Sequence, residues 1–158
     1  MRRAFGEWIT NIARKDDSIY LIVGDIGYGI FDKFRKEFPN RFINIGICEQ
    51  SMIGVVAGMA LQGLKPYVFT ITPFLIERAF EQVKIDININ NTNVKLIGYD
   101  DYPGQGPTHA LTDNGKFMEI FKNIKSYWPK DSKETIKFLE ESYVSGCPTF
   151  IRLQYAKD

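Results

Sequence analysis

The sequence predicts an α/β fold in which helices cover both faces of a mainly parallel sheet. Short apolar runs of strand length alternate with segments of helical periodicity along the chain. No repeat, low-complexity tract or linker interrupts this alternation, so we place no domain boundary within residues 1–158. We therefore predict a single three-layer α/β/α domain with a sheet of about six strands.

The strands are predicted from apolar runs, which in a sheet covered on both faces are nearly continuous. The first run, Ser18-Ile-Tyr-Leu-Ile-Val23, ends at a glycine-rich turn over residues 24–29. The later runs span residues 41–45, 66–71, 94–99, 126–128 and 148–153. We expect each of them to be a strand of one sheet.

The helices are predicted from periodicity and from turn residues. Phe31, Phe34 and Phe38 have helical spacing, which Pro39 ends. Further helices are predicted over residues 49–61, 74–87 and 132–145, with another that Asp113 is placed to cap. A loop rich in glycine and proline is predicted over residues 100–112.

Composition excludes several classes of protein. Twenty Lys and Arg against nineteen Asp and Glu leave a net charge of +1, which argues against broad electrostatic binding to nucleic acid or membrane. The longest charge-free stretch, Gln50–Leu64, is too short and glycine-rich to span a bilayer, and Glu7 interrupts any signal-peptide pattern. Cys48 and Cys147 form no CxxC pair, so we expect reduced thiols, no metal site and a cytoplasmic location.

Ligands of open parallel sheets bind beyond the carboxyl ends of the strands, where the strand order reverses. The segments that follow the predicted strands are therefore the places to look for chemistry. They are residues 25–29, 46–50, 72–77, 100–109 and 129–131.

A nucleotide site is one interpretation of the first of these segments. Gly24, Gly27 and Gly29 are spaced G-x-x-G-x-G, which is the reverse of the dinucleotide fingerprint, although Glu49 lies about where a ribose-binding acid belongs. Asp25 would repel a pyrophosphate. We therefore disfavour a stand-alone nucleotide-binding domain.

The segment that begins at Glu49 is unusual because Ser51–Leu61 is apolar on every side, which a helix on the surface of one domain cannot be. Gly54 and Gly58 lie one turn apart and allow another backbone to approach. Glu49 itself has two interpretations. It is either a carboxylate favoured by the helix dipole or a partly desolvated functional group.

His109 is the only histidine, in the motif Gly104-Gln-Gly-Pro-Thr-His109. A lone loop histidine is often incidental, but the glycines and proline hold this one at the expected ligand-binding edge. Two other features have ordinary explanations. Phe74 and Phe80 are by default core aromatics, and Arg78 with Glu81 is by default a surface salt bridge at i, i+3.

Taken together, these segments resemble the pyrimidine-binding domain of transketolase-like thiamine diphosphate enzymes. Residues 46–61, Gly-Ile-Cys-Glu-Gln-Ser-Met-Ile-Gly-Val-Val-Ala-Gly-Met-Ala-Leu, are similar to the family pattern G-I-x-E-Q-x-M-x-G-x-A-x-G-x-A-L. The similarity continues in collinear order through residues 66–70, 74, 78–82, 93–96, 106–109 and 149–153. It covers nearly the whole chain.

The resemblance implies half of an active site between two subunits. It implies that Glu49 hydrogen-bonds the aminopyrimidine of thiamine diphosphate and drives its tautomerisation, as general acid–base catalysis relayed through the cofactor. It implies that Phe74 packs on this ring and that Ile71 occupies the position of a second stacking aromatic. Asp25 matches an acidic residue near the cofactor, and His109 matches a histidine that handles substrate oxygens.

The chain also departs from the family pattern. Glu77 stands where some members carry tyrosine, and Trp128 stands where an arginine for substrate phosphate is usual. Gln105 replaces a common acidic residue. These differences concern the substrate, so the resemblance implies intact cofactor activation with altered sugar-phosphate specificity.

The sequence contains no G-D-G…N motif for magnesium and diphosphate. We therefore expect a split enzyme, in which a separate diphosphate-binding transketolase subunit holds Mg²⁺ and completes a heterotetramer. The leading function is two-carbon ketol transfer between sugars. The alternatives are a 2-oxo acid decarboxylating subunit, a deoxyxylulose-phosphate-synthase-like subunit and a non-catalytic interaction domain.

Overall fold

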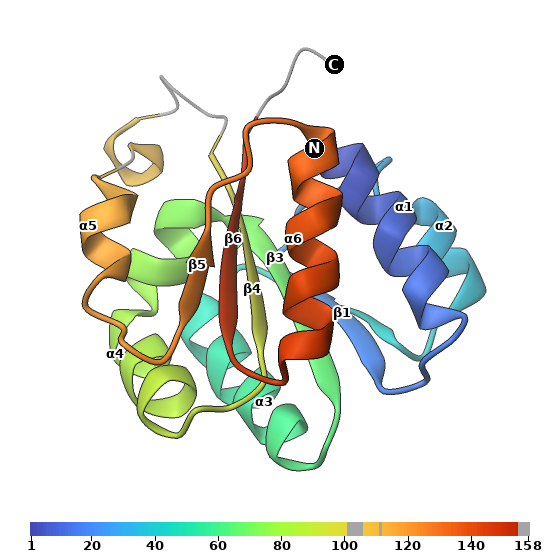
Figure 1. The fold of residues 1–158 in the computed structure, drawn as a ribbon, viewed down its shortest axis with the longest axis horizontal. Helices are drawn as coiled ribbons and strands as arrows, with labels where there is room; N and C mark the ends of the chain where they lie inside the picture. The colour runs from blue at the N-terminus through green and yellow to red at the C-terminus, as the bar shows by residue number, and fades with distance from the viewer. Residues whose placement is uncertain (101–105, 111, 155–158) are drawn as a thin grey trace.

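The computed structural model describes residues 1–100, 106–110 and 112–154 of the chain (Figure 1). Its centre is a six-stranded sheet with the order β2-β1-β3-β4-β6-β5. Every neighbouring pair of strands is parallel. The predicted α/β class, with helices on both faces of a parallel sheet, is confirmed.

The strands lie where the apolar runs predicted them. They are β1 Ile19–Val23, β2 Phe42–Asn44, β3 Lys65–Ile71, β4 Lys95–Tyr99, β5 Lys125–Tyr127 and β6 Thr149–Leu153. The central strands β3 and β4 are buried almost throughout, which explains their continuous apolar sequence.

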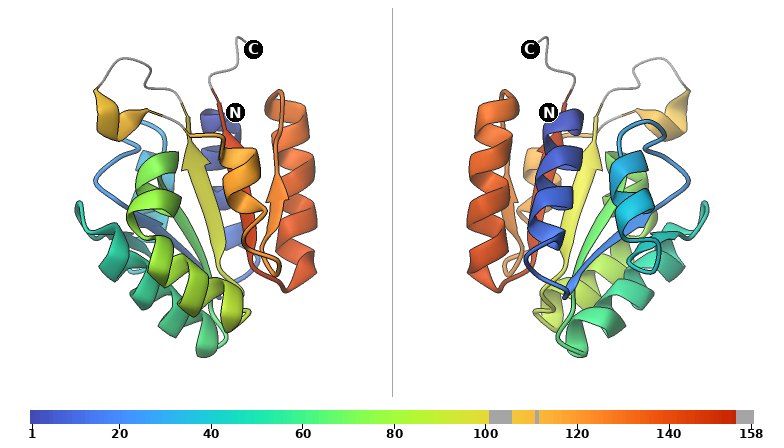
Figure 2. Two further views of the ribbon diagram at one scale, coloured as in Figure 1. Left: turned by 90° about the vertical axis from the view of Figure 1, so that its left-hand side faces the viewer. Right: turned by 90° about the vertical axis from the view of Figure 1, so that its right-hand side faces the viewer.

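The helices form two layers. Helices α1 Arg2–Ala13, α2 Asp32–Glu37 and α6 Ser132–Ser145 pack on one face of the sheet, and the second layer contains α3 Glu49–Leu61, α4 Phe80–Gln82 and α5 Asn114–Met118. In Figure 1 the sheet lies between the two layers, and each view of Figure 2 looks onto one of them. Asp113 caps α5 as predicted, because its Oδ1 accepts the Lys116 N–H.

The predicted helix over residues 74–87 has a different form. It consists of two π-helical segments, η1 Phe74–Arg78 and η2 Val83–Ile89, on either side of α4. A short 3₁₀ turn, η3 Pro107–His109, carries the histidine. Helical periodicity predicted the position of the element but not its wider turns.

Two cores lie on opposite faces of the sheet, and successive residues of one strand belong to different cores. Leu21 and Tyr67 face the layer of α1, α2 and α6, whereas Ile22 and Val68 face α3 and its neighbours. This alternation is the two-residue periodicity of a strand. The sheet is thereby fixed from both sides.

Helix α1 is an element that we did not predict. Phe5, Trp8, Ile9 and Ala13 are buried along one side of it, at the spacing of an amphipathic helix. Phe5 packs against Phe31 and the aromatic residues of β3. The periodicity that predicts this helix is present in the sequence.

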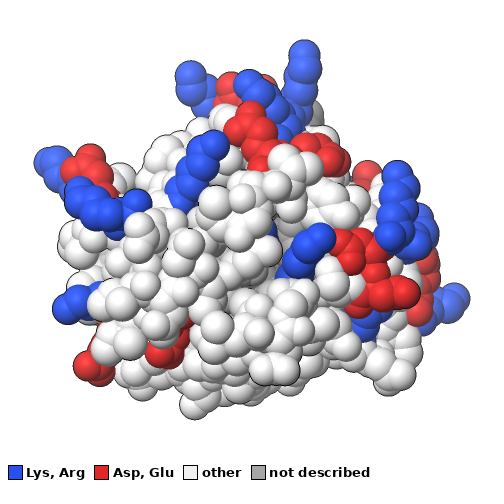
Figure 3. Space-filling model, turned by 60° about the horizontal axis from the view of Figure 1, so that its bottom comes forward, with Lys and Arg blue, Asp and Glu red and all other residues white. Residues whose placement is uncertain are grey.

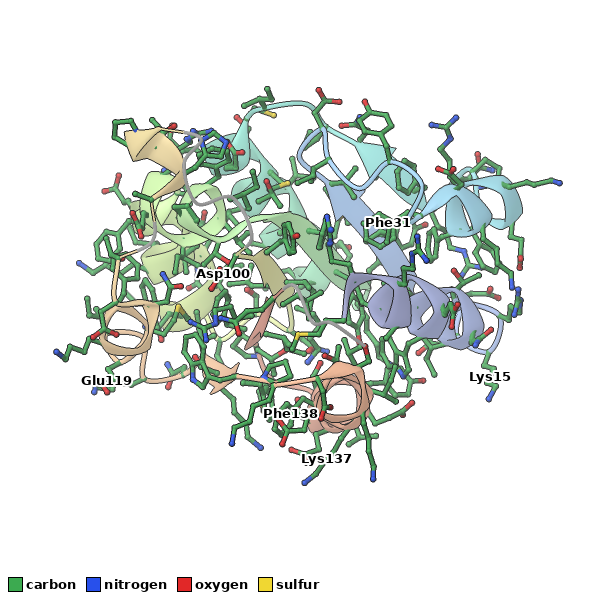
Figure 4. The ribbon with its side chains drawn as sticks, turned by 90° about the horizontal axis from the view of Figure 1, so that it is seen from above. Lys15, Phe31, Asp100, Glu119, Lys137 and Phe138 are labelled. Atoms are coloured by element: carbon green, nitrogen blue, oxygen red, sulfur yellow. The ribbon has the colours of Figure 1, made fainter. Side chains whose placement is uncertain are left out.

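The strand order reverses between β1 and β3, since β1 connects to β2 at one edge and the chain then crosses to β3. The residues that follow β1, β3 and β4 emerge at the same end of the sheet. Figure 4 looks onto this end, with Asp100, the residue after β4, labelled. A ligand site is expected at this place.

None of the helices in the described residues is long and apolar enough to cross a membrane. The prediction at Gln105 falls in the segment 101–105, which is outside the described residues.

Candidate active site

A cavity of about 190 Å³ lies at the strand ends, beside the reversal of strand order. Its wall comes from the segments after β1 and β2, from the end of β3, from η1 and from η3. The lining residues are Gly24, Asp25, Ile26, Ile47, Glu49, Thr70, Ile71, Phe74 and His109. All five residues predicted for the site, Asp25, Glu49, Ile71, Phe74 and His109, line this one cavity.

Glu49 is the first residue of α3, and its side chain is only 1% exposed. Its Oε2 accepts a hydrogen bond from Arg78 Nη1 at 2.9 Å. Its Oε1 is buried without a hydrogen-bond partner among the described residues. A buried carboxylate oxygen without a donor is costly, so this atom is where a ligand donor would be most favourable.

Gly24 makes room for this carboxylate. A Cβ at Gly24 would lie 3.1 Å from Thr70 Oγ1 and 3.7 Å from Glu49 Oε1. The first of these distances is tighter than an ordinary van der Waals contact, so a Cβ at this position would push the Thr70 side chain by a few tenths of an ångström. The glycine that resembled part of a nucleotide fingerprint therefore serves close packing beside Glu49.

The apolar part of the cavity comes from Phe74 and Ile71. Phe74 is half-buried at the start of η1, and Ile71 is buried at the end of β3. The His109 ring meets Phe74 edge to face, with ring centroids 4.8 Å apart. Phe80, in contrast, packs against Phe117 and Phe121, so it is a core aromatic.

Asp25 is held at the mouth of the cavity by a small network. Asn44 Nδ2 donates to Asp25 Oδ1 at 3.0 Å, and the Asp25 N–H donates back to Asn44 Oδ1 at 3.1 Å. The Tyr28 hydroxyl donates to the same Oδ1. The hydrogen bonds from Asn44 and Tyr28 lower the pKa of Asp25, so this carboxylate is ionised at neutral pH.

Arg78 corrects one prediction. Its i, i+3 spacing suggested a surface pair with Glu81, but its ion pair is with Glu49, a residue 29 positions earlier. The guanidinium carbon also lies 3.8 Å from the centre of the Phe74 ring. Sequence reasoning missed Arg78 as a site residue because this contact is not local.

Glu77 and Trp128, two further residues that depart from the family pattern, each make specific side-chain contacts. Glu77 accepts a hydrogen bond from the Thr112 hydroxyl at 2.6 Å, which ties η1 to the segment after His109. Trp128 packs edge to face on Phe150, and the Arg152 guanidinium carbon lies 4.8 Å from its ring centre. Arg152 in turn pairs with Asp100.

The outer face of α3 is exposed although most of the residues on it are apolar or glycine. Gly54 and Gly58 have open space where a Cβ would lie, and Val55 and Leu61 are exposed beside them. Figure 3 brings the bottom of the molecule forward and shows a broad uncharged area with charged groups near its margins. The helix predicted to be apolar on every side therefore buries one side in this chain and leaves the other uncovered.

Comparison with known proteins agrees with this geometry. The family model described as "Transketolase, pyrimidine binding domain" matches residues 1–156. The chain belongs to this family. A solved structure described as "Split gene transketolase, inactive beta4 tetramer" superposes with a TM-score of 0.87 at 28% identity, covering 97% of this chain and 50% of that one.

Among curated proteins, this pyrimidine-binding-domain chain is similar to one subunit of a transketolase and to a synthase. It is 42% identical over 123 residues to a subunit of the apulose-4-phosphate transketolase of Actinobacillus succinogenes, covering 76% of this chain and 40% of the relative. It is 34% identical over 157 residues to the 1-deoxy-D-xylulose-5-phosphate synthase of Acinetobacter baumannii, covering 94% of this chain and 24% of the relative. The chain thus spans less than half the length of these relatives.

Proposed function

We propose that this chain is the pyrimidine-binding subunit of a heteromeric, thiamine diphosphate-dependent transferase of the transketolase type. The observation that carries the proposal is Glu49. Its carboxylate is buried beside an apolar cavity, and one of its oxygens has no hydrogen-bond donor among the described residues. Membership of the transketolase pyrimidine-binding family supports the same cofactor.

The residues present fit the aminopyrimidine part of the cofactor. The cavity of about 190 Å³ is smaller than the roughly 300–1,000 Å³ of pockets that enclose a drug-sized ligand, so it suits a single ring. Phe74 and Ile71 supply apolar walls for the faces of that ring, and Glu49 Oε1 supplies the polar partner at its edge. Bound thiamine diphosphate supplies a carbanion that carries a two-carbon unit.

The roles of the chain's own groups follow from their positions. Glu49 hydrogen-bonds the ring through Oε1 and exchanges a proton with it, in a buried setting that excludes water. His109, whose ring contacts Phe74, hydrogen-bonds substrate oxygens at the open side of the cavity. Asp25 places a fixed negative charge at the mouth.

A partner subunit completes the site. Ile47 is 72% exposed although it lines the cavity beside Glu49, which suits a wall that another chain continues. The uncovered apolar face of α3 is the proposed contact surface. We propose that the partner is a separate diphosphate-binding transketolase subunit that holds Mg²⁺, with two copies of each chain. The free thiols of Cys48 and Cys147 suit a cytoplasmic enzyme of carbohydrate metabolism.

The first test is the native complex. Mild purification from the source organism, followed by mass spectrometry, is expected to recover an equimolar second chain with a diphosphate-binding motif and bound thiamine diphosphate. Recovery of this chain alone, without cofactor, would favour a non-catalytic interaction domain. Val55→Glu on α3 is expected to abolish recovery of the partner, whereas Val144→Glu, an equally apolar exposed position on α6, is not.

The second test is Glu49→Gln in the reconstituted complex. Loss of the proton relay is expected to reduce turnover by at least ~100-fold, the lower end of general acid–base contributions. The matched control is Glu81→Gln, which removes an exposed carboxylate next to η1. Unchanged turnover in Glu49→Gln would refute the catalytic role.

A second candidate is a synthase that condenses a decarboxylated 2-oxo acid with an aldehyde. It is favoured by the similarity to 1-deoxy-D-xylulose-5-phosphate synthase over nearly the whole chain. The two candidates differ in the donor. A ketol transferase consumes a ketose, for which apulose 4-phosphate is the first donor to assay, whereas the synthase releases carbon dioxide from a 2-oxo acid.

A further inference from the structure

The two carboxylate oxygens of Glu49 lie in different surroundings. Glu49 separates the cavity that contains Phe74 and His109 from a second cavity of about 170 Å³. Arg78 lines only the second cavity and donates to Oε2. Gly24 lines only the first cavity, and the position of its absent Cβ is near Oε1. Arg78 therefore reaches the carboxylate from behind and leaves the cavity-side oxygen available to a ligand.

Arg78 is itself held by two contacts at once. Its Nη1 bonds Glu49 at 2.9 Å, and its guanidinium carbon lies 3.8 Å from the centre of the Phe74 ring. A planar guanidinium can stack on an aromatic ring while its edge donates to a carboxylate, which an ammonium cannot do equally well. The cation thus links the catalytic carboxylate to the aromatic wall of the same cavity.

The backbone explains how one short element supplies both residues. Phe74 and Arg78 are the first and last residues of η1, a single π-helical turn that directly follows Pro73. Isolated π-helical turns occur frequently at functional sites. This turn brings Phe74 and Arg78 together behind Glu49, which enters from a different segment of the chain.

We propose that Arg78 is a positioning residue for cofactor activation. It orients Glu49 so that Oε1 faces the aminopyrimidine, and it balances the charge that this carboxylate buries. Glu49 is 1% exposed and Arg78 is 38% exposed, so removal of the cation leaves a buried carboxylate without its partner and free to turn away from the cavity. This inference rests on the proposed function, because it assigns Arg78 a role through Glu49.

The experiment measures activation of the cofactor separately from turnover. The reconstituted complex is saturated with thiamine diphosphate in deuterium oxide without substrate, and exchange of the cofactor's reactive ring proton is followed by NMR after rapid acid quenching. Arg78→Met is expected to slow this exchange by about 10-fold or more, as for loss of a hydrogen bond to a charged group. Arg78→Lys is expected to recover part of the rate, because it keeps the charge but not the stacking.

Three comparisons make the outcome decisive. Lys84→Met, which removes an exposed cation in η2, is expected to leave exchange unchanged. If Glu49→Gln slows exchange but Arg78→Met and Arg78→Lys do not, the positioning role is overturned while the proposed function stands. If Glu49→Gln also leaves exchange unchanged, the proposed function itself fails.

A purely structural role has a different signature. In that case Arg78→Met would lower the unfolding temperature or the cofactor affinity, and exchange at saturating cofactor would be normal. That result would also overturn the proposal. If Arg78→Met does not assemble, Arg78→Lys carries the test: exchange equal to wild type at saturating cofactor refutes the role, and slowed exchange supports it.

Discussion

The rings of His109 and Phe74 meet edge to face at 4.8 Å between centroids and 71° between planes. Phe74 is thereby bounded by two polar groups, since the Arg78 guanidinium also lies against its ring. The histidine comes from η3 and the arginine from the far end of η1. The Phe74 ring thus contacts both His109, the residue proposed to bind substrate, and Arg78, the residue proposed to position Glu49.

His109→Ala is expected to separate substrate handling from cofactor binding. The substitution removes the imidazole at the open side of the cavity but leaves Glu49 and the Phe74 ring in place. Turnover by the reconstituted complex should fall by about 100-fold, within the range for a group that assists proton transfer or binds a charged transition state. Cofactor affinity, measured by calorimetry, should change by less than about threefold, because no cofactor contact is removed. Equal losses in both quantities would contradict the assignment.

Asp25→Asn removes the negative charge of the side chain and keeps its size and shape. Asp25 has a φ of 55°, a conformation that asparagine also tolerates, and an amide oxygen can accept the same bonds from Asn44 and Tyr28. The free energy of unfolding of the isolated chain should therefore fall only slightly, because hydrogen bonds to a carboxylate become hydrogen bonds to a neutral amide. If the negative charge acts on the cofactor, affinity in the complex should fall by about 10-fold.

Asn44→Ala is the companion change. It removes the two hydrogen bonds between Asn44 and Asp25 and the one that Asn44 Oδ1 accepts from the Gly46 N–H, but it keeps the charge and the bond from Tyr28. It should therefore weaken cofactor binding and lower the free energy of unfolding by about 1 kcal/mol. Chemical denaturation of the isolated chain measures the second effect. Wild-type values for Asp25→Asn and Asn44→Ala alike would mean that Asp25 has no part in the site.

Much of this arrangement was predictable because it depends on local patterns. The apolar runs predicted all six strands, and helices 49–61 and 132–145 have the predicted bounds. The site residues could be grouped because carboxyl ends of parallel strands meet at one edge of the sheet. The resemblance to the family then distinguished Glu49 and His109 from ordinary polar residues.

What escaped prediction is non-local or depends on backbone detail. The pairing of Arg78 with Glu49 joins residues far apart in sequence, whereas the i, i+3 rule considers only neighbours on one helix. The π-helical turns of η1 and η2 retain an apolar periodicity close to that of an α-helix. Helix α1 is a different case, because the helical spacing of its buried apolar residues is a local pattern that is present in the sequence.

Gly54→Ala and Gly58→Ala should each stabilise the isolated chain but weaken its association with the partner subunit. Both positions have open space for a Cβ in this chain, and alanine favours a helix over glycine by about 1 kcal/mol. Each variant should therefore raise the free energy of unfolding of the isolated chain. In the complex the added methyl would meet a closely packed partner backbone and weaken association.

Chemical denaturation and analytical ultracentrifugation measure these two effects. Lys133→Ala, at an exposed position of α6 on the opposite face of the sheet, is the control and should leave association unchanged. Unaltered association of both glycine variants with the partner would show that the outer face of α3 is not the contact surface.

Lys95 should give the free energy of unfolding a distinctive pH dependence. Its side chain is fully buried at the start of β4, and Nζ donates to the Cys147 carbonyl oxygen at 2.6 Å. Burial lowers the pKa of Lys95 to about 8, below the ordinary value of 10.5. Between these two values the unfolded chain binds more protons than the folded chain, so the contribution of Lys95 makes stability rise with pH.

Lys95→Met removes this contribution. The free energy of unfolding of the wild type minus that of Lys95→Met should therefore increase between pH 8 and pH 10.5, by up to about 3 kcal/mol, and should be flat below about pH 7. Taking the difference cancels the opposing effect of the buried tyrosines, because both proteins contain them. Urea denaturation at half-unit pH intervals measures it. A difference that is constant across this window would mean that Lys95 keeps its proton in the folded chain.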